Sequence, residues 1–160
     1  MSLAAVVSIG SCCAYAVVSS LPPSDKALMA AFKANKPVYE QLRGMLQHED
    51  PLITMVADWG VMRGESTIRP EDLRLPGASF PAERYDEYMR LLKKIGGLSV
   101  SRFRAPDPQI RILVWASGFA GDTIHEAICW QPDEQELARL HDYYKPIEES
   151  WFVYRDFKPH

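Results

Sequence analysis

The sequence predicts an α+β fold, a two-layer sandwich in which an antiparallel β-meander packs against two amphipathic helices. Two long segments in the first two thirds of the chain have helical periodicity, and short alternating segments dominate the last third. Helices and strands in separate blocks are typical of a sheet with helices on one face. The length of 160 residues fits a single domain, which we expect over residues 24–160.

The first predicted helix covers residues 25–47 and follows Ser24-Asp25, which are good N-cap residues. Apolar side chains recur along it at steps of three and four residues: Leu28, Phe32, Tyr39, Leu42, Met45 and Leu46. Pro37 removes one backbone hydrogen bond and clashes with the preceding turn. We therefore expect a kink, or two helices that meet at Asn35-Lys36.

A short apolar segment, residues 52–59, predicts a strand. Residues 60–79 show no periodicity and predict a long irregular loop, a feature that is often functional. The second helix is predicted to open at Pro81 and to end at Gly96-Gly97. Its apolar face holds Tyr85, Tyr88, Leu92 and Ile95.

The last third predicts a meander of three antiparallel strands, then a short helix and a final strand. The ranges are 98–104, 109–118 and 124–130 for the meander, 133–141 for the helix and 151–157 for the final strand. In the middle strand, Ile110, Ile112 and Val114 are expected on one face, with Arg111, Leu113 and Trp115 on the other. All four tryptophans fall in predicted strands, which favours the core for Trp59, Trp115, Trp130 and Trp151.

The first 23 residues are the most distinctive segment. No charged residue stands between Leu3 and Leu21, a run about as long as the roughly 20 residues that span a bilayer. Ala14-Tyr15-Ala16 is a site of the kind that signal peptidase cuts, and Ile9-Gly10-Ser11-Cys12 resembles a lipobox, in which Cys12 would be acylated. We interpret residues 1–23 as a signal peptide, a lipoprotein signal or a membrane anchor.

One observation leaves this interpretation open. No Lys or Arg precedes Lys26, whereas a signal has a positively charged start. A buried helix or strand of the fold is the remaining alternative for the segment. If the chain is cut after Ala16, it keeps only Cys129, which is interpreted as a small buried hydrophobic residue.

The order of aromatic and apolar residues resembles a family of small bacterial lipoproteins and secreted proteins. The residues that carry this resemblance are Phe32, Tyr39, Leu42, Met45, Arg84, Tyr88, Leu91, Gly96, Tyr144, Ile147, Trp151, Phe152 and Tyr154. The resemblance covers roughly Ala27 to Asp156 and implies two amphipathic helices, an antiparallel sheet and a final Trp-aromatic-x-Tyr strand. It implies an envelope location but no particular activity. Glu126-Ala127-Ile128 stands where the family has a Lys-Gly-Tyr segment.

No motif for nucleotide binding, nucleophilic catalysis or zinc binding is present, and we expect no cofactor and no metal site. His125-Glu126 begins like a zinc-protease motif, but Cys129 stands in place of the second histidine. The weak catalytic candidates are Asp58, His125 and His141. Asp58 ends an apolar segment, where partial burial would raise its pKa for acid or base catalysis, although a carboxylate that caps a turn is the simpler interpretation.

The charges argue against nucleic acid and leave a protein partner as the expectation. There are 18 Lys and Arg residues against 21 Asp and Glu residues, without a basic run that would neutralise a line of phosphates. The predicted loop alternates in charge, which indicates either a solvated surface or a docking site. The interaction candidates are Arg63, Glu65, Arg69, Arg74 and Trp115.

These observations predict a non-catalytic binding module of the bacterial cell envelope, in the periplasm or anchored to the membrane only through its N-terminus. One version is an immunity or inhibitor protein whose net charge of −3 favours a basic partner. The alternatives are a small hydrolase with a dispersed Asp/His site and a carrier of an apolar ligand. An unprocessed N-terminus would instead place the protein in the cytoplasm. The ligand and the oligomeric state are left open.

Overall fold

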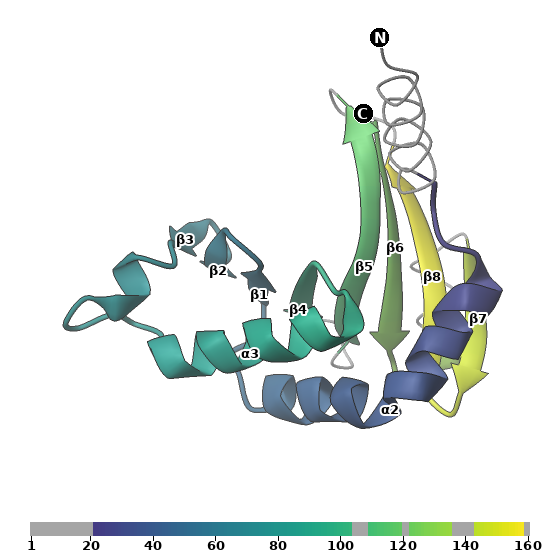
Figure 1. Ribbon diagram of the computed structural model, residues 1–160, viewed down its shortest axis with the longest axis horizontal. Helices are drawn as coiled ribbons and strands as arrows, with labels where there is room; N and C mark the ends of the chain where they lie inside the picture. The colour runs from purple at the N-terminus through teal and green to yellow at the C-terminus, as the bar shows by residue number, and fades with distance from the viewer. Residues whose placement is uncertain (1–20, 104–108, 120–121, 136–142, 159–160) are drawn as a thin grey trace, which may run out of the picture.

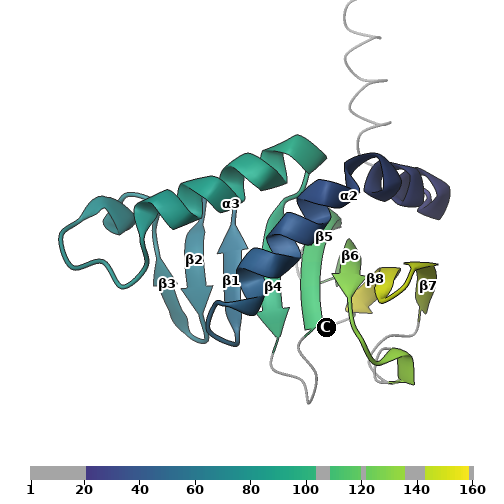
Figure 2. The same cartoon turned by 90° about the horizontal axis from the view of Figure 1, so that it is seen from below.

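The computed structural model describes residues 21–103, 109–119, 122–135 and 143–158. Within them, eight strands form one antiparallel sheet, and two long helices lie across one of its faces (Figures 1 and 2). The predicted α+β sandwich is confirmed. The segment that contains Cys12, and His141, lie outside the described residues.

The sheet order is β3-β2-β1-β4-β5-β6-β8-β7. The strands are β1 (Ile53–Val56), β2 (Gly60–Arg63), β3 (Ser66–Ile68), β4 (Ser99–Phe103), β5 (Gln109–Phe119), β6 (Asp122–Trp130), β7 (Tyr143–Glu148) and β8 (Trp151–Lys158). Strands β4, β5 and β6 pair consecutively, which confirms the meander. The β1–β3 hairpins lie at one end of the sheet and β7 at the other (Figure 1).

Helix α2 (Asp25–Gln47) has the predicted kink. The Ser24 side chain accepts a hydrogen bond from the Ala27 N–H at its start. Asn35 departs from helical geometry, with φ −122° and ψ 16°, two residues before Pro37. This position follows from the proline, whose ring disturbs the turn that precedes it.

Helix α3 (Ala82–Ile95) ends as predicted. Gly96 adopts the left-handed conformation, with φ 66°, and the Gly97 N–H bonds to the Leu92 carbonyl. At the other end, Pro81 precedes the first helical residue rather than occupying it, because its backbone is extended. A one-residue difference at a helix end is small and leaves the buried face unchanged.

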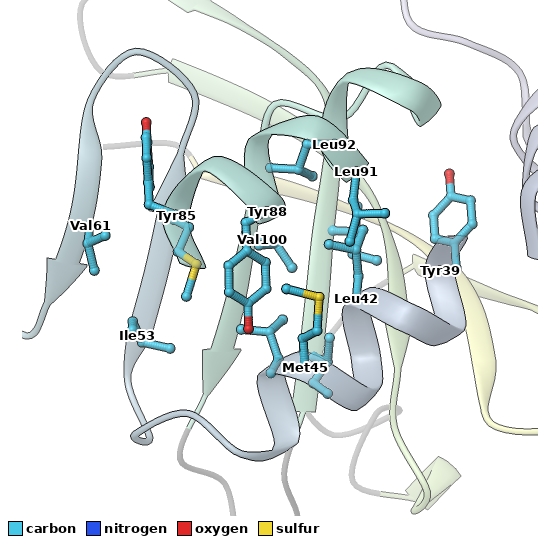
Figure 3. Close-up of a cluster of buried hydrophobic side chains, with 14 of the residues drawn as sticks. Tyr39, Leu42, Met45, Ile53, Val61, Tyr85, Tyr88, Leu91, Leu92 and Val100 are labelled. Atoms are coloured by element: carbon cyan, nitrogen blue, oxygen red, sulfur yellow. The ribbon is translucent and has the colours of Figure 1, made fainter. Parts of the chain in front are cut away.

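The core lies between the two helices and the sheet (Figure 3). All the apolar residues predicted for α2 are buried, as are Tyr85, Tyr88 and Leu92 from α3. They pack on side chains from β1, β2, β4 and β5, including Ile53, Met55, Val61, Val100 and Ile112. Each fully buried side chain of this kind contributes about 1.5–3 kcal/mol of hydrophobic stabilisation.

An aromatic cluster joins the N-terminal half of α2 to β8. The Trp151 ring lies 5.1 Å from Phe32 and 6.0 Å from Tyr39, measured between ring centroids. Its indole N–H donates to the Glu40 carboxylate over 2.8 Å. Burial raises the pKa of Tyr39 to about 12 and keeps its hydroxyl protonated.

Polar contacts join the C-terminal end of α2 to its neighbours. Glu49 accepts hydrogen bonds from Arg84 (2.8 Å) and from the Tyr88 hydroxyl (3.2 Å), both on α3. Arg102 on β4 donates to the carbonyl groups of Gln47 and Glu49. Because the last carbonyls of a helix lack intrahelical partners, Arg102 also serves as a cap.

The segment 52–79 is more regular than predicted. The strand expected over residues 52–59 spans only Ile53–Val56, and the expected loop contains β2, β3 and a short 3-10 helix, η1 (Asp72–Arg74). Strand β7 was also not predicted. These strands are short, so their sequences show too little alternation to be recognised, and pairing with the adjacent strand defines them instead.

A β-bulge between Leu113 and Trp115 changes the predicted faces of β5. Leu113 pairs with Ala127 and Trp115 with Glu126, so the two residues lie on opposite faces. The prediction that Trp115 shares a face with Arg111 is therefore wrong. An extra residue in one strand reverses the alternation beyond it.

The face of the sheet opposite the helices carries a second apolar cluster. Ala127, Cys129, Phe152 and Tyr154 are buried there. Burial raises the pKa of the Cys129 thiol to about 12, so the thiol stays protonated at neutral pH. Cys129 is the small buried hydrophobic residue that was expected.

Of the predicted helix 133–141, the structure describes only the beginning, at residues 134–135. None of the helices in the described part of the chain has the length and apolar character needed to cross a bilayer.

Gly60, at the start of β2, gives a test of the hairpin geometry. Its φ is +100°, and a Cβ there would overlap the Ile68 carbonyl group. We expect Gly60→Ala to lower the free energy of unfolding by more than about 2 kcal/mol, because backbone atoms cannot move aside cheaply. Gly64→Ala is the matched control. Its φ is +55° but nothing lies within 4 Å, so it should cost only about 1 kcal/mol. Equal losses in urea unfolding would contradict this account.

Candidate functional site

The turn between β1 and β2 places a tryptophan in solvent. Residues 57–59 connect the paired residues Val56 and Gly60, and Asp58 has a φ of +65°. The Ala57 N–H donates to the Leu98 carbonyl and the Trp59 N–H to the Val56 carbonyl. These hydrogen bonds and the close backbone contact at Gly60 restrain the turn. The Trp59 side chain at its end is 69% exposed.

A groove lies between this turn and α3. It has a volume of about 430 Å³, and apolar atoms of Tyr85, Met89 and Leu92 contribute to its walls. Charged side chains from three segments also line it: Asp58, Arg74, Asp86 and Lys93. The groove is therefore apolar with charged groups of both signs.

A second hollow of about 450 Å³ lies on the other side of the hairpin. Trp59, Met62 and Thr67 line it together with Arg69 and Glu71. Asp58 and Pro70 line both hollows, so the two are adjacent. We call Trp59 and these two hollows the Trp59 surface.

Tyr85 links the groove to the turn. Its hydroxyl donates to the Val56 carbonyl over 3.0 Å. Burial is the main cause that raises the pKa of Tyr85, so the hydroxyl keeps its proton and remains a donor at neutral pH. This bond attaches the last residue of β1 to α3.

The charges of the Trp59 surface are paired but exposed. Arg74 donates to both carboxylate oxygens of Asp86 over 3.2–3.3 Å, and Arg69 lies 3.9 Å from Glu71. All four side chains are more than half exposed. Exposed ion pairs of this kind contribute little to stability, so they can exchange partners at low cost.

The structure brings together only some of the predicted interaction residues. Arg69 and Arg74 meet at the Trp59 surface, where Asp58, a catalytic candidate, also lies. Arg63 instead pairs with Asp50 (3.4 Å) and lies over the Phe80 ring, while Glu65 lies in the β2–β3 turn. Trp115 lies on β5, away from the hairpins.

Two of the catalytic candidates, Asp58 and His125, are separated. His125 is on β6, and β4 and β5 lie between it and β1, which leads into Asp58. Three strand spacings correspond to about 14 Å. The described residues also contain no group of three or more His, Cys, Asp and Glu side chains placed to hold a metal ion.

Trp59 is the residue that the sequence interpretation missed, because it was assigned to a strand and to the core. The signal for its exposure was present. Asp58-Trp59-Gly60 combines two residue types that tolerate positive φ, which is the chemistry of a hairpin turn. A strand that ended at Val56 would have placed Trp59 at the tip.

Comparison of the chain with protein-family models, curated proteins and solved structures gives no match. The resemblance to small bacterial lipoproteins and secreted proteins stays a prediction.

The Tyr85 bond gives a prediction about the support of the site. Tyr85→Phe should lower the free energy of unfolding by about 1 kcal/mol, because the Val56 carbonyl loses its donor. Trp59→Ala should change it by less than about 0.5 kcal/mol, because the side chain is exposed. Urea unfolding of both variants checks this. A larger loss for Trp59→Ala would mean that Trp59 is structural.

Proposed function

We propose that this protein is a non-catalytic binding module of the bacterial cell envelope and that it captures a protein partner through the Trp59 surface. The observation that carries the proposal is the exposed Trp59 on a restrained turn between two hollows. Tryptophan is enriched among the residues that dominate binding energy at interfaces. A restrained turn also reduces the entropy lost on binding.

The charges of the site favour a protein partner over nucleic acid. Asp58, Glu71 and Asp86 stand beside Arg69, Arg74 and Lys93, so the surface has no excess of positive charge. A protein surface that presents an apolar anchor and charges of both signs would complement it. In the immunity or inhibitor version, the net charge of −3 would aid the approach of a basic partner.

The two alternatives receive less support. A hydrolase that used Asp58 and His125 would need the two in one cleft, and His125 is three strand spacings away from β1. His141, the other candidate, lies outside the described residues. A carrier of an apolar ligand would need an apolar cavity, and the groove beside α3 has charged residues around it. Both remain testable by ligand and substrate screens.

The partner is tested by site-specific photo-crosslinking in the source bacterium. A photoreactive phenylalanine analogue at position 59 should give one discrete adduct. The same analogue at Leu52 is the control, because Leu52 is 49% exposed at the opposite end of β1. Trp59→Ala should weaken binding to the identified partner by at least about tenfold. The same adducts at both positions, or none at position 59, would contradict the proposal.

The location is tested by intact mass and cell fractionation of the full-length protein in a bacterium. A lipoprotein would begin at Cys12, carry an acyl mass increment and sediment with membranes. A secreted protein would begin at Val17 and appear in the soluble periplasm. An uncleaved chain that sediments with membranes would indicate an anchor. An unprocessed chain in the cytoplasm would refute the envelope location without bearing on the Trp59 surface.

A further inference from the structure

A polar groove crosses the face of the sheet opposite the helices. It has a volume of about 220 Å³ and extends over β1, β4, β5 and β6. It is lined by Thr54, Ser99 and Ser101, which carry hydroxyl groups, together with Arg111 and His125. The groove is separate from the Trp59 surface and shares no residue with it.

Arg111 is the unusual member of this groove. Its side chain is only 20% exposed, and desolvation is the main cause that lowers its pKa. The ordinary pKa of arginine is so high that the guanidinium nevertheless stays charged. The guanidinium lies 4.1 Å from the Phe103 ring centroid and 5.6 Å from that of Tyr154. The two rings exclude water from part of the cation.

The ion pair between Arg111 and Asp156 is a loose one. The closest anionic contact joins Nη1 to Asp156 Oδ2 over 3.6 Å, which is longer than a hydrogen bond. A structural Arg–carboxylate pair is typically bidentate, with distances of about 2.7–2.9 Å. A guanidinium has five N–H donors, and because Arg111 lines the groove, a ligand bound there is within reach of them.

Neighbouring hydroxyl groups supply more donors. The Thr54 hydroxyl donates to Ser101 Oγ over 3.0 Å, so the Ser101 hydroxyl proton is left to donate elsewhere. Ser99 and Ser101 are 8% and 6% exposed and lie on β4 beside β5, where Ser101 pairs with Arg111. A fork of N–H groups with adjacent O–H donors is the arrangement that binds an oxyanion.

We propose that this groove binds a small carboxylate, with Arg111 as the bidentate donor and Ser101 as an auxiliary donor. The volume of the groove suits a small ligand. Asp156 selects a monoanion over a phosphate dianion, because its charge repels a dianion about twice as strongly. The ligand and Asp156 compete for the same guanidinium.

This competition makes the proposal testable by variants with opposite effects. Acetate is titrated into the ¹⁵N-labelled full chain at constant ionic strength and pH 7, and NMR shifts are followed at Ser99, Ser101 and the Arg111 Nε–H. We expect saturable shifts. Asp156→Asn should tighten acetate binding about fivefold or more, because it removes the competing charge. Arg111→Lys should weaken binding at least about tenfold, because the fork is lost.

Arg43→Lys is the matched control. Arg43 is also partly buried, paired with a carboxylate (Glu40) and placed over an aromatic ring (Trp130), but it belongs to α2. It should leave acetate binding unchanged. If Arg111→Lys fails to fold by circular dichroism, Asp156→Asn and Ser101→Ala carry the test, and Ser101→Ala should weaken binding. Shifts that do not saturate, no tightening in Asp156→Asn, or tighter binding of inorganic phosphate than of acetate would overturn the proposal.

Discussion

The packing of Trp151 against the kinked helix α2 is the interaction on which the rest of the structure depends. Phe32 and Tyr39 stand on either side of the kink at Asn35, and both contact the indole ring. Helix α2 thereby covers the β6–β8 end of the sheet with its first half and the β4 region with its second. The Arg102 and Glu49 contacts then fix its C-terminal end to β4 and α3.

The helices cover one face of the sheet. The two proposed sites lie on surfaces that the helices do not cover. The Trp59 surface lies at the end of a hairpin that extends past the β1–β4 pairing, and Tyr85 is the contact that connects it to α3. The Arg111 groove lies on the opposite face, where Thr54, Ser99 and Ser101 line it beside Arg111. The two sites differ in chemistry. The Trp59 surface combines an exposed aromatic side chain with exposed charges, whereas the Arg111 groove combines a desolvated guanidinium with hydroxyl donors.

The backbone geometry of the β1–β2 turn lowers the stability of the fold and keeps Trp59 exposed. Asp58 adopts a positive φ, and Gly60 allows a backbone approach that no other residue permits. In return, a large aromatic side chain is held in solvent instead of in the core. Such an arrangement is costly for folding, and in the proposed function the exposed side chain contacts the partner.

The sequence by itself determined the helices, the kink, the glycine cap and the meander, because these follow from periodicity, proline chemistry and turn residues close together in the chain. Only the tertiary structure decided that residues 60–68 form strands, since such short strands exist through their pairing. It also decided the bulge that turns Trp115 away from Arg111, the exposure of Trp59, and the meeting of Arg111 with Ser101 and Asp156. These features depend on register between strands distant in sequence, and one extra or missing residue in a strand reverses which face a side chain occupies.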